Sequence, residues 1–561
     1  MNDQPNLSSF VNEMSSFSED AQAASAKIAS AGAALSPLGQ VIDIAGSGSQ
    51  IRMDAATLVG MQAHSDPSVS MSGQVGSQVK MSVGDNWLIA NVRTMKAGAP
   101  GEILAAIDFL GEGNRSSGGM SNFRRGVTRY PIPGSDVYPV STEELRGVFA
   151  ADDSPHIEIG TVYPTDDIRG ALYVDPMLSK HFAILGSTGT GKSTSVALIL
   201  HRISQLSPEG HIVMIDPHGE YSAAFKDCGE LFNVDNLQLP YWLMNFEEHC
   251  EVLLTSRGDE RQRDADILAK VLLAARTKGK DMSTLGKVTV DSPIPYLLTD
   301  LNAIIVNEMG KLDRAGDTLP FQRLKTKLEE LRADPRYTFM FSGMLVSDTM
   351  PAFLSRLFRL PANGKPISIV DVSGVPSDIT SVVVSVLARM VFDYAIWSRT
   401  EAQRPLLLVC EEAHRYVPKD EHSGAQAVRK ILERIAKEGR KYGVSLGLIT
   451  QRPSDLAEGV LSQCGTIIAM RLNNERDQAC VRAAMPEGAR GFLDAIPALR
   501  NRECIVCGEG VAIPIRVRFD DLEPEKRPAS SDPSFAALWR ETGGEEGIIQ
   551  RTVKRWRGHG R

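Results

Sequence analysis

The hydrophobic pattern of the chain changes several times along its length. Between about residues 36 and 165, short β-prone segments alternate with Gly, Pro, Asp and Ser, a texture that predicts a small β-barrel or sandwich. The predicted strands are Gln40–Ile44, Gln78–Val83, Trp87–Val92, Val148–Ala150 and His156–Val162. From about residue 166 onward, strand-like apolar runs alternate with helical periodicity, which indicates an α/β domain.

Helical periodicity interrupts this α/β pattern from about residue 240 to 345. The candidate helices are Phe246–Leu254, Asp264–Thr277, Pro295–Lys311 and Leu319–Arg332. Largely apolar runs then resume, as expected for parallel strands that are buried on both faces. They are Pro366–Val370, Leu406–Val409 and Val444–Thr450, and the β-rich stretch Glu503–Phe519 closes the core. We therefore assign residues 166–239 and 346–523 to one α/β core, with residues 240–345 as a helical insertion.

The two ends of the chain differ from this core. Residues 1–35 are rich in Ser and Ala, and one helical face would carry Leu7, Phe10, Val11, Met14 and Phe17. This segment is either a partly ordered tail or a helix that docks on a partner or a neighbouring subunit. Residues 524–561 form a polar tail whose last eleven residues contain five Lys or Arg. That basic end is either a solvated tail or a nucleic-acid contact.

Composition narrows the class of protein. With 561 residues, the chain has room for two to four domains. No apolar stretch reaches the ~18 residues of a membrane-spanning helix, and no basic-then-apolar leader begins the chain, so we expect a cytoplasmic protein without a membrane partner. Seven scattered cysteines fit a reducing compartment, and the lone C-x-x-C of Cys504 and Cys507 lies in an apolar strand, which favours core cysteines over a metal site. The net charge of −8 argues against a general polyanion-coating protein, although a ring can confine its basic residues to a channel.

The most specific motif is a Gly-rich loop at residues 186–193, Gly-Ser-Thr-Gly-Thr-Gly-Lys-Ser. The apolar run His181–Leu185 precedes it as a buried strand, and Thr194–Leu200 follows it as the opening of a helix. Backbone N–H groups of such a loop cradle phosphates, Lys192 neutralises the β- and γ-phosphate charge, and the Ser193 hydroxyl ligates Mg²⁺. We therefore expect ATP and Mg²⁺ as cofactors. The predicted nucleotide-binding residues are Gly186, Ser187, Thr188, Gly189, Thr190, Gly191, Lys192, Ser193 and Thr194.

Acidic and amide side chains follow the predicted strands. Glu411 and Glu412 come just after the strand Leu406–Val409, at the sheet edge where α/β folds bind ligands, so we expect Glu411 to hold Mg²⁺ and Glu412 to orient or deprotonate the attacking water. Asp216 also ends a buried strand; it acts near the metal or the next subunit, or else it belongs to a structural turn. Gln451 ends a third strand, where it can contact the γ-phosphate and report hydrolysis.

A predicted helix at Ala425–Lys441 carries basic residues opposite its apolar face. Such a face is usually only solvated. In ring ATPases, however, an arginine is often presented to the γ-phosphate of the neighbouring subunit. Arg440 is the first candidate for this role because it lies near the helix end, just before the strand that leads to Gln451. Arg434 and Lys441 are weaker candidates.

With these residues in place, the chain resembles the HerA family of hexameric ATPases, which are relatives of FtsK-type DNA pumps. The matching segments are Leu185–Ser193, Asp216–Tyr221, Asp371–Pro376, Glu411–Pro418, Glu438–Gly443 and Thr450–Pro453. The resemblance covers roughly residues 36–520 and implies a RecA-like P-loop NTPase core with a helical insertion, an N-terminal β-barrel and a homo-hexamer with ATP between subunits. It also implies that Glu411 and Glu412 are the Walker B pair, with Glu in place of the more usual Asp, that Gln451 is the sensor and that Arg440 acts in trans.

The same resemblance implies a function. Family members translocate on double-stranded DNA and commonly act with a separately encoded partner, which is a NurA-type nuclease in end processing, or a nuclease or sirtuin-like NAD hydrolase in antiviral defence. Our first hypothesis is a motor that feeds duplex DNA to such a nuclease. The alternative is an ATPase scaffold that assembles and regulates an effector enzyme without processive movement. A VirB4-like secretion motor is disfavoured, because no membrane-directed segment is visible.

Overall fold

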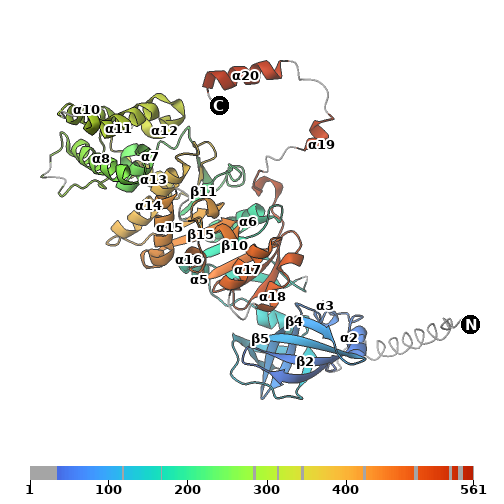
Figure 1. Cartoon of the computed structure of the whole chain (residues 1–561). Coiled ribbons are helices and arrows are strands. Elements are labelled where there is room, and N and C mark those ends of the chain that lie inside the picture. The colour runs from blue at the N-terminus through green and yellow to red at the C-terminus, as the bar shows by residue number, and fades with distance from the viewer. Residues whose placement is uncertain are drawn as a thin grey trace, which may run out of the picture. The chain divides into compact units, whose positions relative to one another are not determined.

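The computed structural model describes residues 35–116, 119–165, 167–281, 283, 286–311, 315–342, 347–420, 425–485, 490–529, 534–540 and 547–559 (Figure 1). The chain divides into two compact units. Unit 1 comprises Met1–Ile203, Thr450–Ser454 and Leu461–Asp521, and unit 2 comprises Ser204–Ile449, Asp455–Val460 and Leu522–Arg561. The helical face predicted within residues 1–33 lies outside the described residues.

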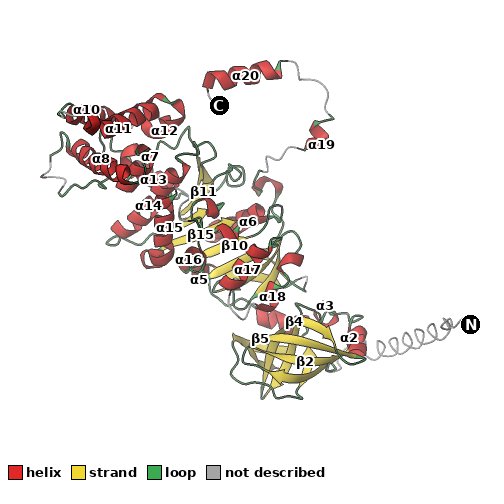
Figure 2. Cartoon of the chain, viewed as in Figure 1, coloured by secondary structure: helices red, strands yellow, loops and turns green. Residues whose placement is uncertain are grey.

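Unit 1 begins with a closed β-barrel (Figure 2). Six antiparallel strands follow one another in the order β2-β1-β7-β3-β4-β5, the pairing of β2 with β5 closes the circle, and β6 extends the sheet from β5. Inward-facing apolar residues such as Ile51, Val79, Leu88 and Ile107 fill its interior. The predicted β-barrel is thus confirmed. Its strands are β1 Gly39–Ile44, β2 Gly48–Asp54, β3 Gln78–Val83, β4 Asn86–Ala97, β5 Glu102–Ser116, β6 Gly119–Arg125 and β7 Asp136–Pro139.

Two segments predicted as barrel strands differ from the expectation. Val148–Ala150 is not a strand, because Val148 lies in helix α4 (Thr142–Phe149). Ser141 and Glu144 form a capping box at the start of this helix, and Leu145 and Val148 are buried at helical spacing, so local capping and packing outweigh the β-propensity of valine. The segment His156–Val162 is a strand, β8, but it pairs with β18 of the second sheet.

The second sheet of unit 1 carries the phosphate loop. Strand β10 (Phe182–Leu185) pairs in parallel with β16 (Thr466–Met470), and antiparallel strands continue from β16. In order they are β17 Glu503–Gly508, β18 Ile515–Phe519, β8 His156–Val162 and β9 Arg169–Tyr173. The helices are α2 Ala55–Met61, α3 Pro67–Ser70 and α18 Arg490–Leu493 beside the barrel, and α5 Val174–Ser179, α6 Lys192–Leu206 and α17 Glu475–Ala484 beside this sheet.

Unit 2 contains a parallel sheet in the strand order β12-β13-β11-β14-β15. The strands are β12 Gly229–Phe232, β13 Ile367–Asp371, β11 Ile212–Asp216, β14 Leu406–Cys410 and β15 Val444–Thr450. Almost every residue in β11, β13, β14 and β15 is buried, which explains why these strands read as apolar runs without alternation. Among the described residues, one helix, α14 (Thr380–Trp397), has the length and apolar character of a membrane span, and most of it is buried beside β14 and α15 (Gln426–Glu438).

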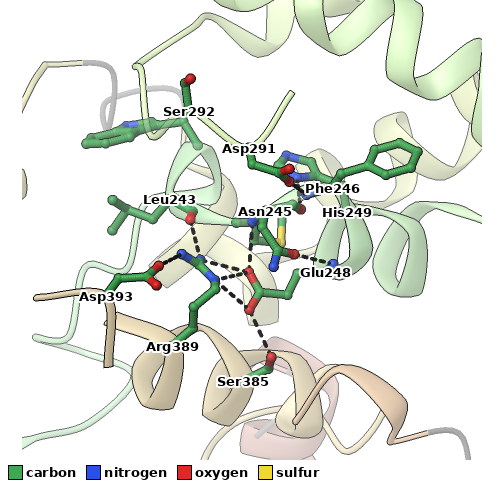
Figure 3. A network of polar contacts seen from close by, with 12 residues as sticks. Leu243, Asn245, Phe246, Glu248, His249, Asp291, Ser292, Ser385, Arg389 and Asp393 are labelled. Carbon is green, nitrogen blue, oxygen red and sulfur yellow. Dashed lines mark hydrogen bonds and ion pairs between the residues drawn. The ribbon is translucent and has the colours of Figure 1, made fainter. Parts of the chain in front are cut away.

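The predicted helical insertion is confirmed in unit 2 (Figure 1). Its helices are α7 Phe246–Leu253, α8 Asp259–Thr277, α10 Leu298–Met309, α11 Ala315–Ala333 and α12 Thr338–Phe341, and α13 Met350–Leu357 follows beyond the predicted bounds 240–345. A buried ion pair anchors α7 to α14 (Figure 3), because Arg389 Nη2 lies 2.9 Å from Glu248 Oε2 and also donates to the carbonyl of Leu243. The Ser385 hydroxyl donates to the other oxygen of Glu248. The remaining described α-helices of unit 2 are α16 Glu458–Leu461, α19 Phe535–Leu538 and α20 Ile548–His559.

These elements confirm the predicted fold class. The chain is an α/β protein with a RecA-like P-loop core, a helical insertion and an N-terminal β-barrel.

Candidate active site

The phosphate loop joins strand β10 to helix α6, as the sequence predicts. Lys192 is the first residue of α6, so the backbone N–H groups of the loop and of the first helical turn converge on one point. Gly189 and Gly191 have φ angles of +77° and +92°, a conformation that L side chains rarely adopt. A Cβ at Gly189 would meet no protein atom within 4 Å, so the concave side of the loop has room for a phosphate group.

Neighbouring strand ends hold this loop in place. The N–H of Gly186 donates to Thr450 O at 3.3 Å, and the N–H of Ser187 donates to Arg471 O at 2.9 Å. On the far side, the N–H of Arg502 donates to Thr190 O at 2.8 Å. The loop is therefore fixed by backbone hydrogen bonds from three separate segments of unit 1, which pre-forms the cradle for an anion.

Gln451 lies beside the phosphate loop, where the sequence predicted it. The Thr188 hydroxyl donates a hydrogen bond to Gln451 Oε1. Since Gln451 directly follows β15, this contact joins a loop residue to the end of a strand. A change at the γ-phosphate position can thus reach β15 through one side-chain contact, as the sensor role requires. That role itself stays a prediction.

Glu411 and Glu412 directly follow strand β14, and their residues are only 4% and 5% exposed. The N–H of Glu411 donates to Ile215 O of the adjacent strand β11. Glu412 has a φ angle of +50°, in the left-handed region that residues other than Gly seldom occupy. Its Oε2 lies 3.2 Å from His414 Nδ1. The backbone thus turns sharply at Glu412, and such strain persists only where the surrounding structure enforces it.

Asp216 is fully buried at the end of β11, and backbone N–H groups engage both of its oxygens. Oδ1 accepts from His218 at 3.1 Å and from Gly219 at 2.9 Å, and Oδ2 accepts from Tyr221 at 2.9 Å. Burial raises the pKa of this carboxyl above its ordinary value, although the three N–H donors oppose that shift. These contacts match the structural alternative, in which Asp216 holds the turn that follows β11.

Tyr221 is a residue that the sequence did not single out for a role. Its hydroxyl donates to Glu411 Oε2 at 3.0 Å, and its ring is 1% exposed and stacks on Phe225. The turn held by Asp216 thereby delivers a hydrogen-bond donor to the carboxylate predicted to hold Mg²⁺. The motif at 216–221 did contain this tyrosine, but its contact with Glu411 depends on β11 and β14 being neighbours, which sequence spacing does not reveal.

The structure separates the three basic candidates near β15. Arg440 lies in a short 3₁₀ segment, Gly439–Tyr442, where it is exposed and makes no ion pair with any described residue. Arg434 instead pairs with Glu438 at 3.5 Å and lies over the ring of Phe392. Lys441 is exposed as well. An arginine that contacts a neighbouring subunit must have a side chain that is not held by an ion pair within its own subunit, so Arg440 remains the best candidate.

The cysteine prediction is confirmed by burial. Cys504 and Cys507 lie in β17 and are fully buried, and burial raises the pKa of the Cys507 thiol to about 12. Within the described ranges, no group of three or more His, Cys, Asp and Glu side chains has the arrangement of a metal site. The phosphate loop and Gln451 belong to unit 1, whereas Asp216, Glu411 and Glu412 belong to unit 2.

Comparison with known proteins confirms the resemblance to the HerA family. The family model described as the central domain of helicase HerA matches residues 157–391. The DNA double-strand break repair helicase HerA of Pyrococcus furiosus is 27% identical over 525 residues, which covers 84% of this chain and 88% of that protein. The protein of the same name from Sulfolobus acidocaldarius is 26% identical, covering 76% and 80%. Among solved structures, VirB4 of Thermoanaerobacter pseudethanolicus is a looser match, with 17% identity and a TM-score of 0.47 over 67% of this chain and 99% of that chain. The phosphate loop and the HerA relatives together identify an ATPase.

Proposed function

We propose that this relative of the HerA helicases is an ATP-driven motor that moves double-stranded DNA. The observation that carries the proposal is the complete phosphate loop with Gln451 in contact with it, because a motor must couple the state of the γ-phosphate to a strand of its sheet. The DNA substrate is inferred from the relatives, which are DNA double-strand break repair helicases and which align with most of this chain.

The residues present fit ATP and Mg²⁺. The loop offers converging N–H groups and open space at Gly189, and Lys192 is placed to neutralise phosphate charge. Ser193 and Glu411 supply the hard oxygen ligands that Mg²⁺ prefers. When bound, Mg²⁺ neutralises charge that develops on the phosphate oxygens. Glu412 would then orient the attacking water and accept its proton, and Gln451 would register loss of the γ-phosphate.

The assembly is inferred from the family and from Arg440. Because Arg440 is exposed after α15 and makes no ion pair with a described residue, we infer a ring, a homo-hexamer as in the family, in which Arg440 acts on the nucleotide of its neighbour. We propose that this motor passes DNA to a separately encoded nuclease or to a defence effector such as a sirtuin-like NAD hydrolase.

The test is the ATPase rate of the full-length protein after its oligomeric state has been measured, with and without linear duplex DNA. A matched pair of variants sets the background. Lys192→Ala removes the phosphate-loop cation, and Lys180→Ala removes an exposed lysine that pairs with Glu509 on the surface. Strong DNA stimulation in the wild type and in Lys180→Ala, but not in Lys192→Ala, supports the motor. Turnover that ignores DNA would instead favour the scaffold that regulates an effector.

A further inference from the structure

A cavity lies in unit 1 beside strand β18. The outward face of β18 and its neighbours borders a cavity of about 600 Å³. Because side chains alternate along a strand, Arg516 and Arg518 point to this face while Val517 and Phe519 are buried behind them. Thr161 of β8 and Glu503 of β17 stand opposite Arg518 in the sheet. A cavity of this size matches the range in which small-molecule ligands bind.

The arginines in and beside the cavity outnumber its carboxylates, so the cavity carries an excess positive charge. Three carboxylates line it, and each has a guanidinium partner. The pairs are Glu503 with Arg516 at 2.7 Å, Asp520 with Arg169 at 3.0 Å, and Asp521 with Arg502. Although burial favours its neutral form, hydrogen bonds from the Arg500 N–H and from Arg516 hold the pKa of Glu503 below its ordinary value, so this carboxylate stays charged and paired.

Arg500 and Arg518 are the two lining arginines that remain. Both are exposed, and neither guanidinium makes an ion pair with any residue that the structure describes. Two uncompensated guanidiniums on one cavity wall attract an anion, and the planar fork of arginine is suited to the oxygens of a phosphate.

The cavity also offers a flat surface. The guanidinium carbon of Arg516 lies 4.2 Å from the ring centroid of Tyr163, and both side chains line the cavity. A tyrosine ring with a guanidinium on it is the kind of stacking surface on which nucleobases rest. The hydroxyls of Thr161 and Thr165 lie in the same lining and can hydrogen-bond a sugar or a base edge.

The turn that carries Arg500 also grips the phosphate loop. Two residues further on, the N–H of Arg502 donates to Thr190 O, and a Cβ at Gly191 would lie 2.9 Å from Arg502 Cγ. The Arg502 guanidinium pairs with Asp521, which lines the cavity. A ligand that pulls on Arg500 therefore acts on a turn that already touches the loop.

We propose that this cavity binds a nucleoside phosphate as a second nucleotide site, with the base on Tyr163 and Arg516 and the phosphates on Arg500 and Arg518. Its ligand is a free nucleotide, and ADP is the candidate because ATP hydrolysis by the proposed motor releases it. Through Arg502, occupancy of the cavity changes how the phosphate loop holds its own nucleotide. The site does not depend on DNA transport, so it stands or falls separately from the proposed function.

The experiment measures binding of fluorescent ADP to the full-length protein by anisotropy titration. In the Lys192→Ala variant the phosphate loop is disabled, and we expect one weaker site per chain to remain. Adding Arg500→Ala and Arg518→Ala to that variant should weaken the remaining site at least 10-fold. The matched control adds Arg124→Ala and Arg125→Ala instead, which removes the same charge from exposed positions on β6 and should leave the site unchanged.

Three outcomes would overturn the proposal. The first is a Lys192→Ala protein that binds no ADP at millimolar concentration, because the cavity then takes no nucleotide. The second is retained binding that survives loss of both arginines, because the second site then lies elsewhere. The third is a stoichiometry of one in the wild type combined with loss of that one site in Arg500→Ala/Arg518→Ala at unchanged melting temperature, because the arginines then serve the loop-bound nucleotide. Loss of binding with a lowered melting temperature is resolved with Arg500→Lys/Arg518→Lys, which keeps the charge and should bind again if the proposal holds.

Discussion

Replacing Tyr221 by Phe tests whether the buried phenol positions Glu411. The substitution keeps the ring and its stacking on Phe225 but deletes the O–H that lies 3.0 Å from Glu411 Oε2. A hydrogen bond to a charged group contributes about 1.5–3 kcal/mol. Since ~1.4 kcal/mol corresponds to a factor of ten in rate, full use of this bond in orienting Glu411 sets a ceiling of about 10- to 150-fold on the loss of kcat.

The assay is steady-state ATP hydrolysis as a function of Mg²⁺ concentration at saturating ATP. We expect the kcat of Tyr221→Phe to fall within that range and its half-saturating Mg²⁺ concentration to rise, while ATP affinity without turnover changes little, because Lys192 and the loop backbone are the groups proposed to hold the phosphates. Tyr130→Phe is the matched control, since its hydroxyl donates to the exposed Gly46 carbonyl of the barrel.

A purely structural role for Tyr221 would give a different pattern. The melting temperature would then fall, while the protein that remains folded would keep the wild-type kcat and the wild-type half-saturating Mg²⁺ concentration. That result would refute the view that the phenol acts through Glu411, and it would leave the tyrosine as a packing residue of the turn.

Four further outcomes are expected. Lys192→Ala should abolish ATP binding at the phosphate loop, measured by calorimetry as loss of the tighter site, because no other cation replaces its charge in the loop. Glu412→Gln should bind ATP normally but lower turnover about 10²- to 10⁴-fold, the range for loss of a general base, in a rapid-quench measurement. Arg440→Ala should lower kcat by about 10³-fold or more with little change in ATP affinity, and mixing it with Lys192→Ala subunits should restore activity, whereas Arg434→Ala should not behave this way. His249 is fully buried and close to Arg276, which lowers its pKa to about 3 from near 6.5 in the unfolded chain. The unfolded state therefore binds the extra proton below pH 6.5, so stability should fall by about 1.4 kcal/mol per pH unit as the pH drops, and urea titrations at pH 7 and 5 should show a smaller drop for His249→Gln.

Local signals in the sequence were sufficient for much of this molecule. The phosphate loop, the buried parallel strands and four helices of the insertion (α7, α8, α10 and α11) were predicted within a few residues, because glycine turns and apolar periodicity act over short distances. Val148 was assigned to a strand because its valine propensity was weighed without the capping box at Ser141.

Contacts between segments far apart in the chain could not be predicted from the sequence. The strand at His156–Val162 was foreseen, but its partner β18 lies at the other end of the chain. The same limit applies to the site, where the contact of Tyr221 with Glu411 depends on two strands, β11 and β14, that are far apart in sequence. The sequence left Asp216 with two possible roles, one in catalysis and one in a structural turn. The three backbone N–H groups that donate to its carboxylate match the structural turn.

The pairing of β8 with β18 also sets an order on how the protein can be made. The barrel strands β1 to β7 lie within residues 39–139 and can close soon after they leave the ribosome. By contrast, Val162 must wait for Val517, about 350 residues later. At ~5–20 residues per second this is a delay of roughly 20 to 70 s, during which β8 can pair with β9 but its other edge has no partner. The nascent chain therefore carries a finished barrel and an unfinished ATPase until almost all of it has been synthesised, and this edge strand is where we expect chaperones to be needed.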